Sequence, residues 1–211
     1  MEHLPKVPQE YVDLALALAK EKSAGIAVRD EYTPVREQPT HLDSKEPIQN
    51  CLIERVLTRN GQQFASRLSP RFSMEEHMAS WVTENINEEW AHVGVSASVR
   101  GDTLNNVGDY LVQGPHTDAT RQYALLYLIE SSNPDQDTVF WQQQGKALHR
   151  KRCQTPLNLD EMTEVDRVRI PMNTWVYFDT SILHSIENVQ GTRIAIQIGF
   201  DCEPFGVFVK D

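Results

Sequence analysis

The chain of 211 residues is long enough for one domain with a substantial hydrophobic core. Its formal net charge of −10 argues against a surface that binds phosphates, so we expect no nucleic acid among its partners. The cysteines, Cys51, Cys153 and Cys202, lie far apart and indicate neither a disulfide framework nor a zinc site. The N-terminal residues lack the pattern of a signal peptide, and no apolar run is long enough to span a bilayer. These features predict a cytoplasmic protein without a membrane partner.

The first part of the chain, residues 1–91, has a mixed and largely helical pattern. Apolar residues at helical spacing predict a helix over residues 8–22. The segment 51–59 is compatible with either a strand or a helix. Ser73 and Glu76 have the spacing of a capping box, which predicts the start of a second helix. We expect these elements to form a layer that packs on the outside of a sheet.

From residue 92 onward, short runs of alternating apolar and polar residues are separated by turn residues, a pattern typical of β-strands. The expected strands cover residues 92–100, 107–113, 121–130, 137–143, 166–171, 174–179, 183–189, 192–200 and 205–209. This succession predicts a sandwich or barrel over residues 92–209 and a single domain over residues 1–211. The polar segment 151–165 is the longest interruption, and we interpret it as a loop that borders a binding site.

Two histidines and a carboxylate form the chemically most informative set in the sequence. His116 and Asp118 lie two residues apart, so both side chains can lie on the same face of an extended segment. His184 follows an apolar strand much later in the chain. Two histidines and one carboxylate, with the opposite side of the metal open, form the facial triad of non-haem Fe(II) oxygenases. The same spacing at His41 and Asp43 lies in a proline-rich polar stretch, where we expect a solvated loop.

Arg193 lies inside the predicted strand 192–200. A guanidinium at this position can hold the carboxylate of a dicarboxylic co-substrate through two parallel hydrogen bonds. A structural alternative is an ion pair with a protein carboxylate such as Glu187 or Asp201, because an unpaired guanidinium is costly to bury.

Three stretches of the sequence resemble the Fe(II)- and 2-oxoglutarate-dependent dioxygenases. Within this family, they resemble the prolyl-hydroxylase-like branch. Residues 108–118 resemble an aromatic strand that ends in His-x-Asp, and residues 170–184 resemble a strand, a turn and a strand before a histidine. Residues 184–193 resemble the segment that runs from this histidine to Gly-x-Arg. The resemblance covers about residues 92–209. It implies a mostly β fold, the double-stranded β-helix or jelly roll, with the N-terminal α-helices packed against it.

The resemblance also implies roles for individual residues. His116, Asp118 and His184 would bind the catalytic Fe(II), and Arg193 would pair with the distal carboxylate of 2-oxoglutarate. Dioxygen would be the second co-substrate, with ascorbate as an accessory reductant. The implied reaction is hydroxylation of an unactivated C–H bond in a small molecule, such as an amino acid or its derivative, or in a peptide side chain. It is coupled to the decarboxylation of 2-oxoglutarate to succinate.

Two positions depart from the pattern of this family. Many members have Ser or Thr two residues after the arginine, where this chain has Ala195. We therefore expect another hydroxyl to help bind the co-substrate, and we select Tyr110 and Tyr127 ahead of Tyr123 by strand position. Gly199 stands where the nucleic-acid demethylase branch has a further arginine, which argues against action on nucleic acid.

Two other functions remain open at this point. One is a different cupin-type metal enzyme that does not use a keto acid. The other is a non-catalytic jelly-roll module that binds or senses a ligand. The sequence leaves the substrate and the oligomeric state open.

Overall fold

The structure is a computed structural model, and it describes residues 4–23, 28–30, 52–68, 71–86, 89–98, 112–118, 121–149, 156, 158–188 and 191–201. Several sequence predictions fall outside these residues: Tyr110, the three cysteines, the loop with His41 and Asp43, most of the strand 107–113, and the strand 205–209. No helix among the described residues combines the length and the apolar character that crossing a bilayer requires.

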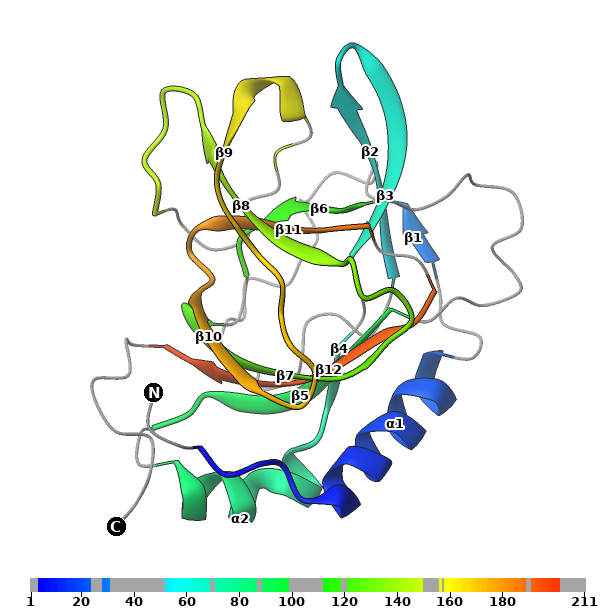
Figure 1. The fold of residues 1–211 in the computed structure, drawn as a ribbon, viewed down its shortest axis with the longest axis vertical. Helices are drawn as coiled ribbons and strands as arrows, with labels where there is room; N and C mark the ends of the chain where they lie inside the picture. The colour runs from blue at the N-terminus through cyan, green and yellow to red at the C-terminus, as the bar shows by residue number, and fades with distance from the viewer. Residues whose placement is uncertain are drawn as a thin grey trace.

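The fold is mostly β, and two antiparallel sheets face each other (Figure 1). The larger sheet has the order β10-β7-β12-β5-β4, and the smaller sheet has the order β6-β11-β8-β9. The bounds are β4 Arg71–Ser73, β5 His92–Ser98, β6 Val112–His116, β7 Tyr123–Ser131, β8 Asp137–Gln143, β9 Met162–Val168, β10 Trp175–Asp179, β11 Leu183–Glu187 and β12 Arg193–Phe200. From β5 to β12 the chain crosses repeatedly between the two sheets, which is the strand order of a jelly roll. The fold predicted from the resemblance is therefore confirmed.

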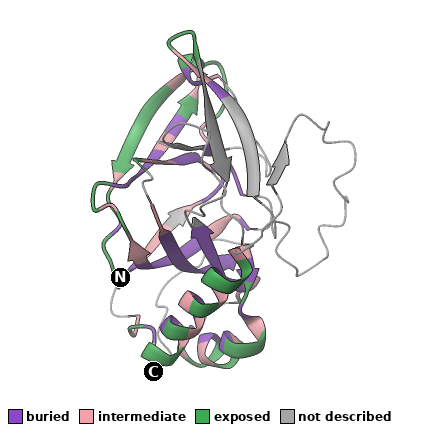
Figure 2. Ribbon diagram, turned by 90° about the vertical axis from the view of Figure 1, so that its right-hand side faces the viewer, coloured by how far each residue is buried: buried purple, intermediate pink, exposed green. Residues whose placement is uncertain are grey.

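Two helices cover the outer face of the larger sheet, α1 (Gln9–Ser23) and α2 (Glu75–Asn85). The strand β12 separates two cores, because successive side chains point to opposite faces. Ile194, Ile196 and Ile198 pack toward the helices, whereas Ala195 joins a smaller cluster on the inner face between the sheets. Every residue of β12 is buried, and Figure 2 shows this buried layer next to helices whose outer sides are exposed.

The start of α2 differs from the predicted capping box. Met74 occupies the N-cap and provides no side-chain cap, while the Ser73 hydroxyl accepts a 3.3 Å hydrogen bond from the backbone N–H of Glu75. Ser73 therefore lies one residue before the N-cap, so Glu76 does not occupy the third helical position that a capping box requires.

The N-terminal layer contains more β structure than the sequence pattern indicated. A three-stranded sheet, β1-β2-β3, is formed by β1 (Val28–Asp30), β2 (Leu52–Arg59) and β3 (Gln62–Leu68). The described part of the ambiguous segment 51–59 is thus a strand, β2. Asn60 and Gly61 both have positive φ, 54° and 70°, as the two-residue turn of a tight hairpin requires.

In the described part of the segment 151–165, regular structure replaces the loop that we expected from residue 159 onward. A short 3-10 helix, η3 (Leu159–Glu161), leads directly into β9, which begins at Met162. Leu159 packs against Leu57 of β2, so this part of the segment lies against the β2–β3 hairpin. The backbone N–H of Asn60 also donates a 2.5 Å hydrogen bond to Asp160.

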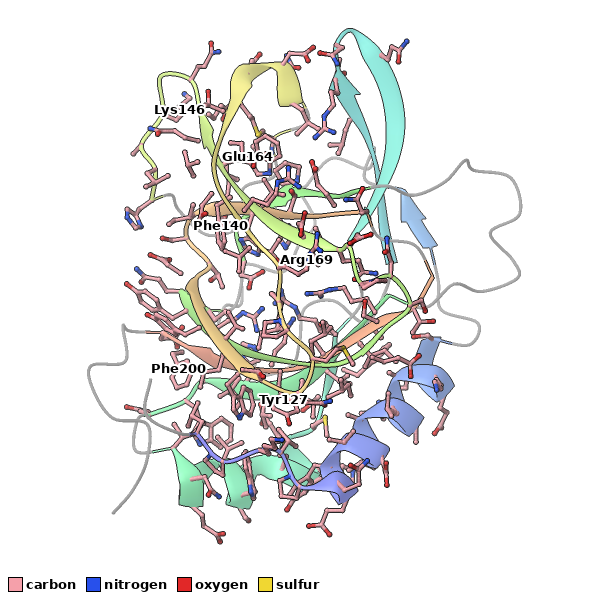
Figure 3. The ribbon with its side chains drawn as sticks, viewed as in Figure 1. Tyr127, Phe140, Lys146, Glu164, Arg169 and Phe200 are labelled. Atoms are coloured by element: carbon pink, nitrogen blue, oxygen red, sulfur yellow. The ribbon has the colours of Figure 1, made fainter. Side chains whose placement is uncertain are left out.

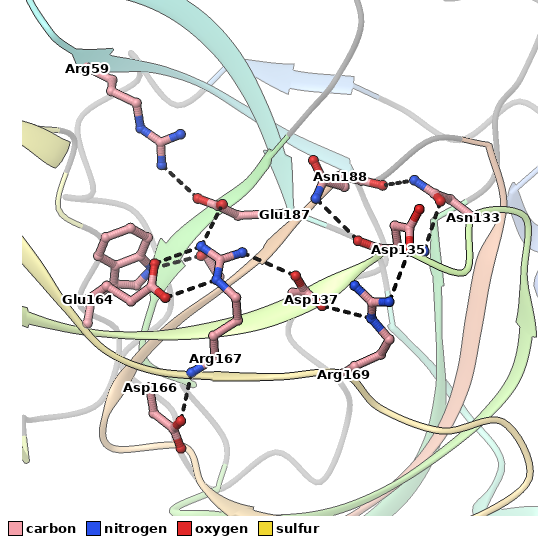
Figure 4. A network of polar contacts seen from close by, with 12 residues as sticks. Arg59, Asn133, Asp135, Asp137, Glu164, Asp166, Arg167, Arg169, Glu187 and Asn188 are labelled. Atoms are coloured by element: carbon pink, nitrogen blue, oxygen red, sulfur yellow. Dashed lines mark hydrogen bonds and ion pairs between the residues drawn. The ribbon is translucent and has the colours of Figure 1, made fainter.

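The outer face of the smaller sheet carries a network of ion pairs (Figure 4). Arg167 lies 2.7 Å from Glu164, 3.2 Å from Glu187 and 3.3 Å from Asp137. Arg59 of β2 lies 2.7 Å from the other oxygen of Glu187. Both carboxylate oxygens of Glu187 therefore form ion pairs with arginines on the outer face of the sheet.

Candidate metal centre

His116 and His184 lie directly opposite each other on neighbouring strands. β6 and β11 pair in antiparallel fashion with His184 opposite His116, and the ring centroids are 4.4 Å apart. Directly opposed residues of an antiparallel pair point to the same face of the sheet. The ladder is irregular just beyond this pair, where Gly114 and Pro115 fall in β6. Proline cannot donate a ladder hydrogen bond, which favours a bulge at this point.

Backbone carbonyls fix both imidazoles in the same orientation. The Nδ1 atom of His116 lies 3.0 Å from the carbonyl oxygen of Gly114, and the Nδ1 atom of His184 lies 2.9 Å from that of Ile182. Because a carbonyl can only accept a hydrogen bond, each Nδ1 must carry the proton. Each Nε2 is then left as the basic nitrogen, the arrangement that metal-bound histidines show.

Asp118 completes the set. Its Oδ1 atom lies 3.6 Å from Nε2 of His116 and 3.9 Å from Nε2 of His184. The ligand atoms of the three residues all lie within 4.8 Å of one another. Two neutral imidazole nitrogens and one carboxylate oxygen suit a divalent transition metal. The three residues selected from the sequence are therefore brought together by the structure, and their donor atoms fit a metal ion.

Two arginines hold the Asp118 carboxylate, one on each oxygen. Nη2 of Arg71, from β4, lies 2.6 Å from Oδ1, and Nε of Arg121 lies 2.5 Å from Oδ2. Burial opposes ionisation of Asp118, but Arg121 and Arg71 outweigh it and hold the pKa of the carboxyl well below its usual range. Burial lowers the pKa of His184. The centre therefore presents an ionised carboxylate and a neutral imidazole, which are the protonation states that metal binding needs.

Arg121 and Thr180 fix the segment that follows His116. The Arg121 side chain is 1% exposed, and burial lowers its pKa to about 10. The Thr180 hydroxyl donates a 3.0 Å hydrogen bond to the carbonyl oxygen of Arg121, and the Thr180 carbonyl oxygen accepts a 3.3 Å bond from the N–H of Asp118. The segment with Asp118 is thus tied to the turn that precedes His184.

Arg193 is 6% exposed, and burial lowers its pKa to about 10. It lies on β12 two residues before Ala195, so both side chains point to the same face of the sheet. Ala195 packs with Leu126 and Leu128 on the inner face. Within the residues that the structure describes, Arg193 has neither an ion pair nor a side-chain hydrogen bond. The alternative ion pair with Glu187 is therefore not formed, since that carboxylate binds Arg59 and Arg167.

Tyr127 lies on the other face of the larger sheet. It is 2% exposed and packs against Trp175, with the ring centroids 5.0 Å apart, in the core that the helices cover (Figure 3). Its hydroxyl interacts with the backbone of Val7, and burial raises the pKa of Tyr127. Tyr123 stacks on Tyr177 at 5.9 Å beside the same core. The structure therefore does not bring Tyr127 or Tyr123 to the metal centre, and Tyr110 lies outside the described residues.

Sequence reasoning missed the two arginines and assigned no role to His92. Arg121 follows Asp118 by three residues, a spacing that could have suggested an ion pair, whereas Arg71 comes from a distant three-residue strand and gives no such signal.

The ring of His92 lies over Gly199, where an added Cβ would come within 2.2 Å of it. Burial, followed by the charges of Arg121 and Arg71, lowers the pKa of His92 to about 3.

No family model matches the chain, and no curated protein matches it. Solved structures that the comparison returns include an oxidoreductase of the 2OG-Fe(II) oxygenase family from Burkholderia pseudomallei, with 9% identity and a TM-score of 0.40. That comparison covers 87% of this chain and 77% of the other. Escherichia coli ycfD has 13% identity and a TM-score of 0.38 over 73% of this chain, which spans 42% of the length of ycfD. The Drosophila melanogaster CENP-C cupin domain has 12% identity and a TM-score of 0.31, covering 92% of this chain and 99% of that domain. At these identities and TM-scores, the likenesses support no conclusion about the fold or the function of this chain.

Proposed function

We propose that the protein is an Fe(II)- and 2-oxoglutarate-dependent dioxygenase that hydroxylates an unactivated C–H bond of a small molecule. The observation that carries this proposal is the pairing of two features on the inner face of one jelly roll. One is the set His116, Asp118 and His184, and the other is the buried guanidinium of Arg193, which has no partner among the described residues. The prolyl-hydroxylase-like pattern of the sequence supports the same assignment.

Each residue has a defined task in this proposal. His116 and His184 offer their Nε2 atoms to Fe(II), and Asp118 offers Oδ1, which leaves the remaining positions for the co-substrates. Arg193 binds the distal carboxylate of 2-oxoglutarate and so gains the anionic partner that a buried guanidinium requires. The apolar side chains of Leu126 and Leu128 pack with Ala195 on the same inner face. Ascorbate would keep the iron ferrous.

Bound iron supplies the activation of dioxygen. In the overall reaction, one oxygen atom enters the C–H bond of the substrate, and the other enters the succinate formed when 2-oxoglutarate loses CO2. A peptide side chain is a second substrate class that fits the same chemistry.

The test measures metal binding and succinate formation in wild-type protein and in His116→Ala. We expect wild-type protein to bind Mn(II), an Fe(II) surrogate, in a calorimetric titration, and to release succinate slowly from 2-oxoglutarate when Fe(II), ascorbate and oxygen are present. His116→Ala should lose both properties, while the matched surface variant His77→Ala keeps them. Metal binding without any consumption of 2-oxoglutarate would instead indicate a cupin-type metal protein that uses no keto acid.

The role of Arg193 has its own test. Arg193→Gln removes a charge-assisted bidentate contact, so we expect the KM for 2-oxoglutarate to rise by about tenfold or more. The Mn(II) affinity should stay within about twofold, because Arg193 is not among the groups that contact the metal ligands. An unchanged KM would remove the co-substrate assignment.

A further inference from the structure

The carboxylate of Asp118 is bound by two guanidinium groups of the chain itself. Nη2 of Arg71 lies 2.6 Å from Oδ1, and Nε of Arg121 lies 2.5 Å from Oδ2. These three side chains carry one negative charge and two positive charges, so their sum is positive. Asp118 is 3% exposed and Arg121 is 1% exposed, and charges in such a buried place are only weakly screened. Asp118 therefore offers a further cation less negative charge than an unpaired carboxylate would.

The two arginines bind different oxygens of this carboxylate. Oδ1 is the atom that lies 3.6 Å from Nε2 of His116 and 3.9 Å from Nε2 of His184. Arg71 donates to this same oxygen, whereas Arg121 donates to Oδ2. An ion held by both Nε2 atoms and by Oδ1 would therefore share Oδ1 with the guanidinium of Arg71. Both can bind there together, because a carboxylate oxygen has two lone pairs.

The charge of Arg71 is not needed to hold Asp118 in place. Arg121 fixes Oδ2, and the backbone N–H of Asp118 donates a 3.3 Å hydrogen bond to the carbonyl oxygen of Thr180. Arg121 alone also balances the single negative charge of the carboxylate. The positive charge of Arg71 is thus additional, and it acts on any cation that shares Oδ1.

The field of the two guanidiniums already acts on a neighbouring side chain. Burial has the largest effect on His92, and the charges of Arg121 and then Arg71 add to it in lowering the pKa of this imidazole to about 3. His92 is not one of the three metal-binding candidates, so it reports the field beside them. A site that resists a proton in this way also opposes other positive charge.

We propose that Arg71 acts on the metal through Asp118 and holds bound iron in the ferrous state. This inference rests on the proposed function, and it concerns the regulation of the same site. Oxidation of Fe(II) to Fe(III) passes one electron to an acceptor such as dioxygen and raises the charge of the ion from two to three. Coulomb repulsion grows with that charge, so Arg71 disfavours Fe(III) more than Fe(II). The guanidinium therefore raises the Fe(III)/Fe(II) potential, and it also weakens the binding of divalent metals.

The experiment measures the potential of the bound iron by redox titration under nitrogen, without 2-oxoglutarate, and follows the electron paramagnetic resonance signal of Fe(III). Mn(II) affinity is measured separately by calorimetry. Arg71→Gln removes the charge and keeps a hydrogen-bond donor for Oδ1, whereas Arg71→Lys keeps the charge. Arg169→Gln is the control, because the Arg169 side chain is 56% exposed on the outer face of the smaller sheet.

We expect Arg71→Gln to raise the ratio of Fe(III) affinity to Fe(II) affinity by about tenfold or more, which is a fall of about 59 mV in the potential. Mn(II) should bind to this variant about tenfold more tightly. Arg71→Lys should stay within about twofold of wild type in both measurements, because it keeps the positive charge. Arg169→Gln should behave as wild type. A purely structural role of Arg71 predicts weaker Mn(II) binding, because Asp118 would then be poorly held.

Three results would overturn the inference: a potential of Arg71→Gln at or above that of wild type, weaker Mn(II) binding by this variant, or an equal fall of the potential in Arg71→Lys. If Arg71→Gln does not fold, Ser96→Asp replaces it, because Ser96 lies directly opposite Arg71 on the neighbouring strand. The new carboxylate would neutralise the guanidinium and should lower the potential. An unchanged potential in Ser96→Asp would likewise overturn the inference.

Failure of the proposed function looks different from failure of this inference. Wild-type protein would then bind Fe(II) without consuming 2-oxoglutarate, and the effect of Arg71 on the potential would still be measured. If wild-type protein binds no Fe(II) at all, the proposed function and the inference are both wrong.

Discussion

Asp118 has two tasks at the scale of single residues. Under the proposed function it would offer one oxygen to the metal, and it neutralises two guanidiniums that would otherwise be buried without an anion. Removing one partner of a buried ion pair costs more than the pair itself contributes, because the remaining charge loses its compensation. The carboxylate is therefore needed for stability even when no metal is bound.

Asp118→Asn should lower the free energy of unfolding by about 3–5 kcal/mol, since Arg71 and Arg121 would lose their anionic partner. Urea denaturation in the presence of a chelator measures this effect independently of metal binding. Asp166→Asn, which changes an exposed carboxylate, is the matched control and should stay within about 0.5 kcal/mol of wild type. Equal stability of the two variants would show that Asp118 is not the counterion of the two arginines.

His92 should make the fold sensitive to acid. Its pKa falls from an ordinary value of 6.5 to about 3 in the folded protein, first because of burial and then because of Arg121 and Arg71. The unfolded chain therefore binds a proton that the folded chain rejects. This contribution to stability is present above pH 6.5 and is lost as the pH falls toward 3, by about 1.4 kcal/mol per pH unit.

The variant His92→Gln isolates this effect, because every other titratable side chain is common to the two proteins. Between pH 7 and pH 5, the stability of wild-type protein should fall by about 2 kcal/mol more than that of the variant. Urea denaturation at several pH values measures the difference. Parallel pH profiles would mean that His92 is protonated with equal ease in the folded and unfolded chains.

At the scale of elements, the alternation of side chains decides which residues reach the centre. Local periodicity predicted the strand 137–143 with its observed bounds. The His-Asp-His set was predicted from the spacing of His116 and Asp118 together with the family resemblance. The sequence pattern did not show which face of the sheet each side chain occupies. Tyr127 lies between Leu126 and Leu128, which face inward, so its ring points to the helices.

Arg71 shows why the rest of the centre could not be predicted. β4 has three residues, too few for a visible alternation, and its position beside β5 depends on a chain reversal that includes α2. The contact between Arg71 and Asp118 joins residues 47 positions apart. Only the assembled sheet brings them together.

The helix α2 should matter for stability and not for the metal centre. Met78 is fully buried between α2 and the larger sheet, on the face opposite Ala195. Met78→Ala should lower the free energy of unfolding by about 2–5 kcal/mol, through lost burial and the cavity that remains. Met172→Ala is the control, because Met172 is 43% exposed and should tolerate the change. Calorimetric titration should give the same Mn(II) affinity for both variants, and a weaker affinity only in Met78→Ala would show that the outer core supports the centre.

At the scale of the whole molecule, the jelly roll places residues from both sheets around one point. Arg71 and His92 belong to the larger sheet, and His116 and His184 belong to the smaller one. Asp118 lies in the connection from β6 to β7, which links the two sheets. A bound metal should therefore stabilise the folded chain as a unit.

Mn(II) at a free concentration of 100 times its Kd should stabilise wild-type protein by about 2.7 kcal/mol, since the unfolded chain offers no assembled site. A rise of Tm in a thermal scan, measured at several Mn(II) concentrations, checks this expectation. His184→Ala should show no rise. An equal rise in His184→Ala would mean that Mn(II) binds elsewhere.

His116 and His184 lie directly opposite each other on two paired strands, so the centre forms only when these strands pair in the correct register. If β11 slipped past β6 by a single position, the imidazole of His184 would turn to the outer face, and the chain would retain the same strands without a chelating pocket. A misaligned chain would thus lack the converging donor atoms of the two histidines, and it would bind no divalent metal at this place.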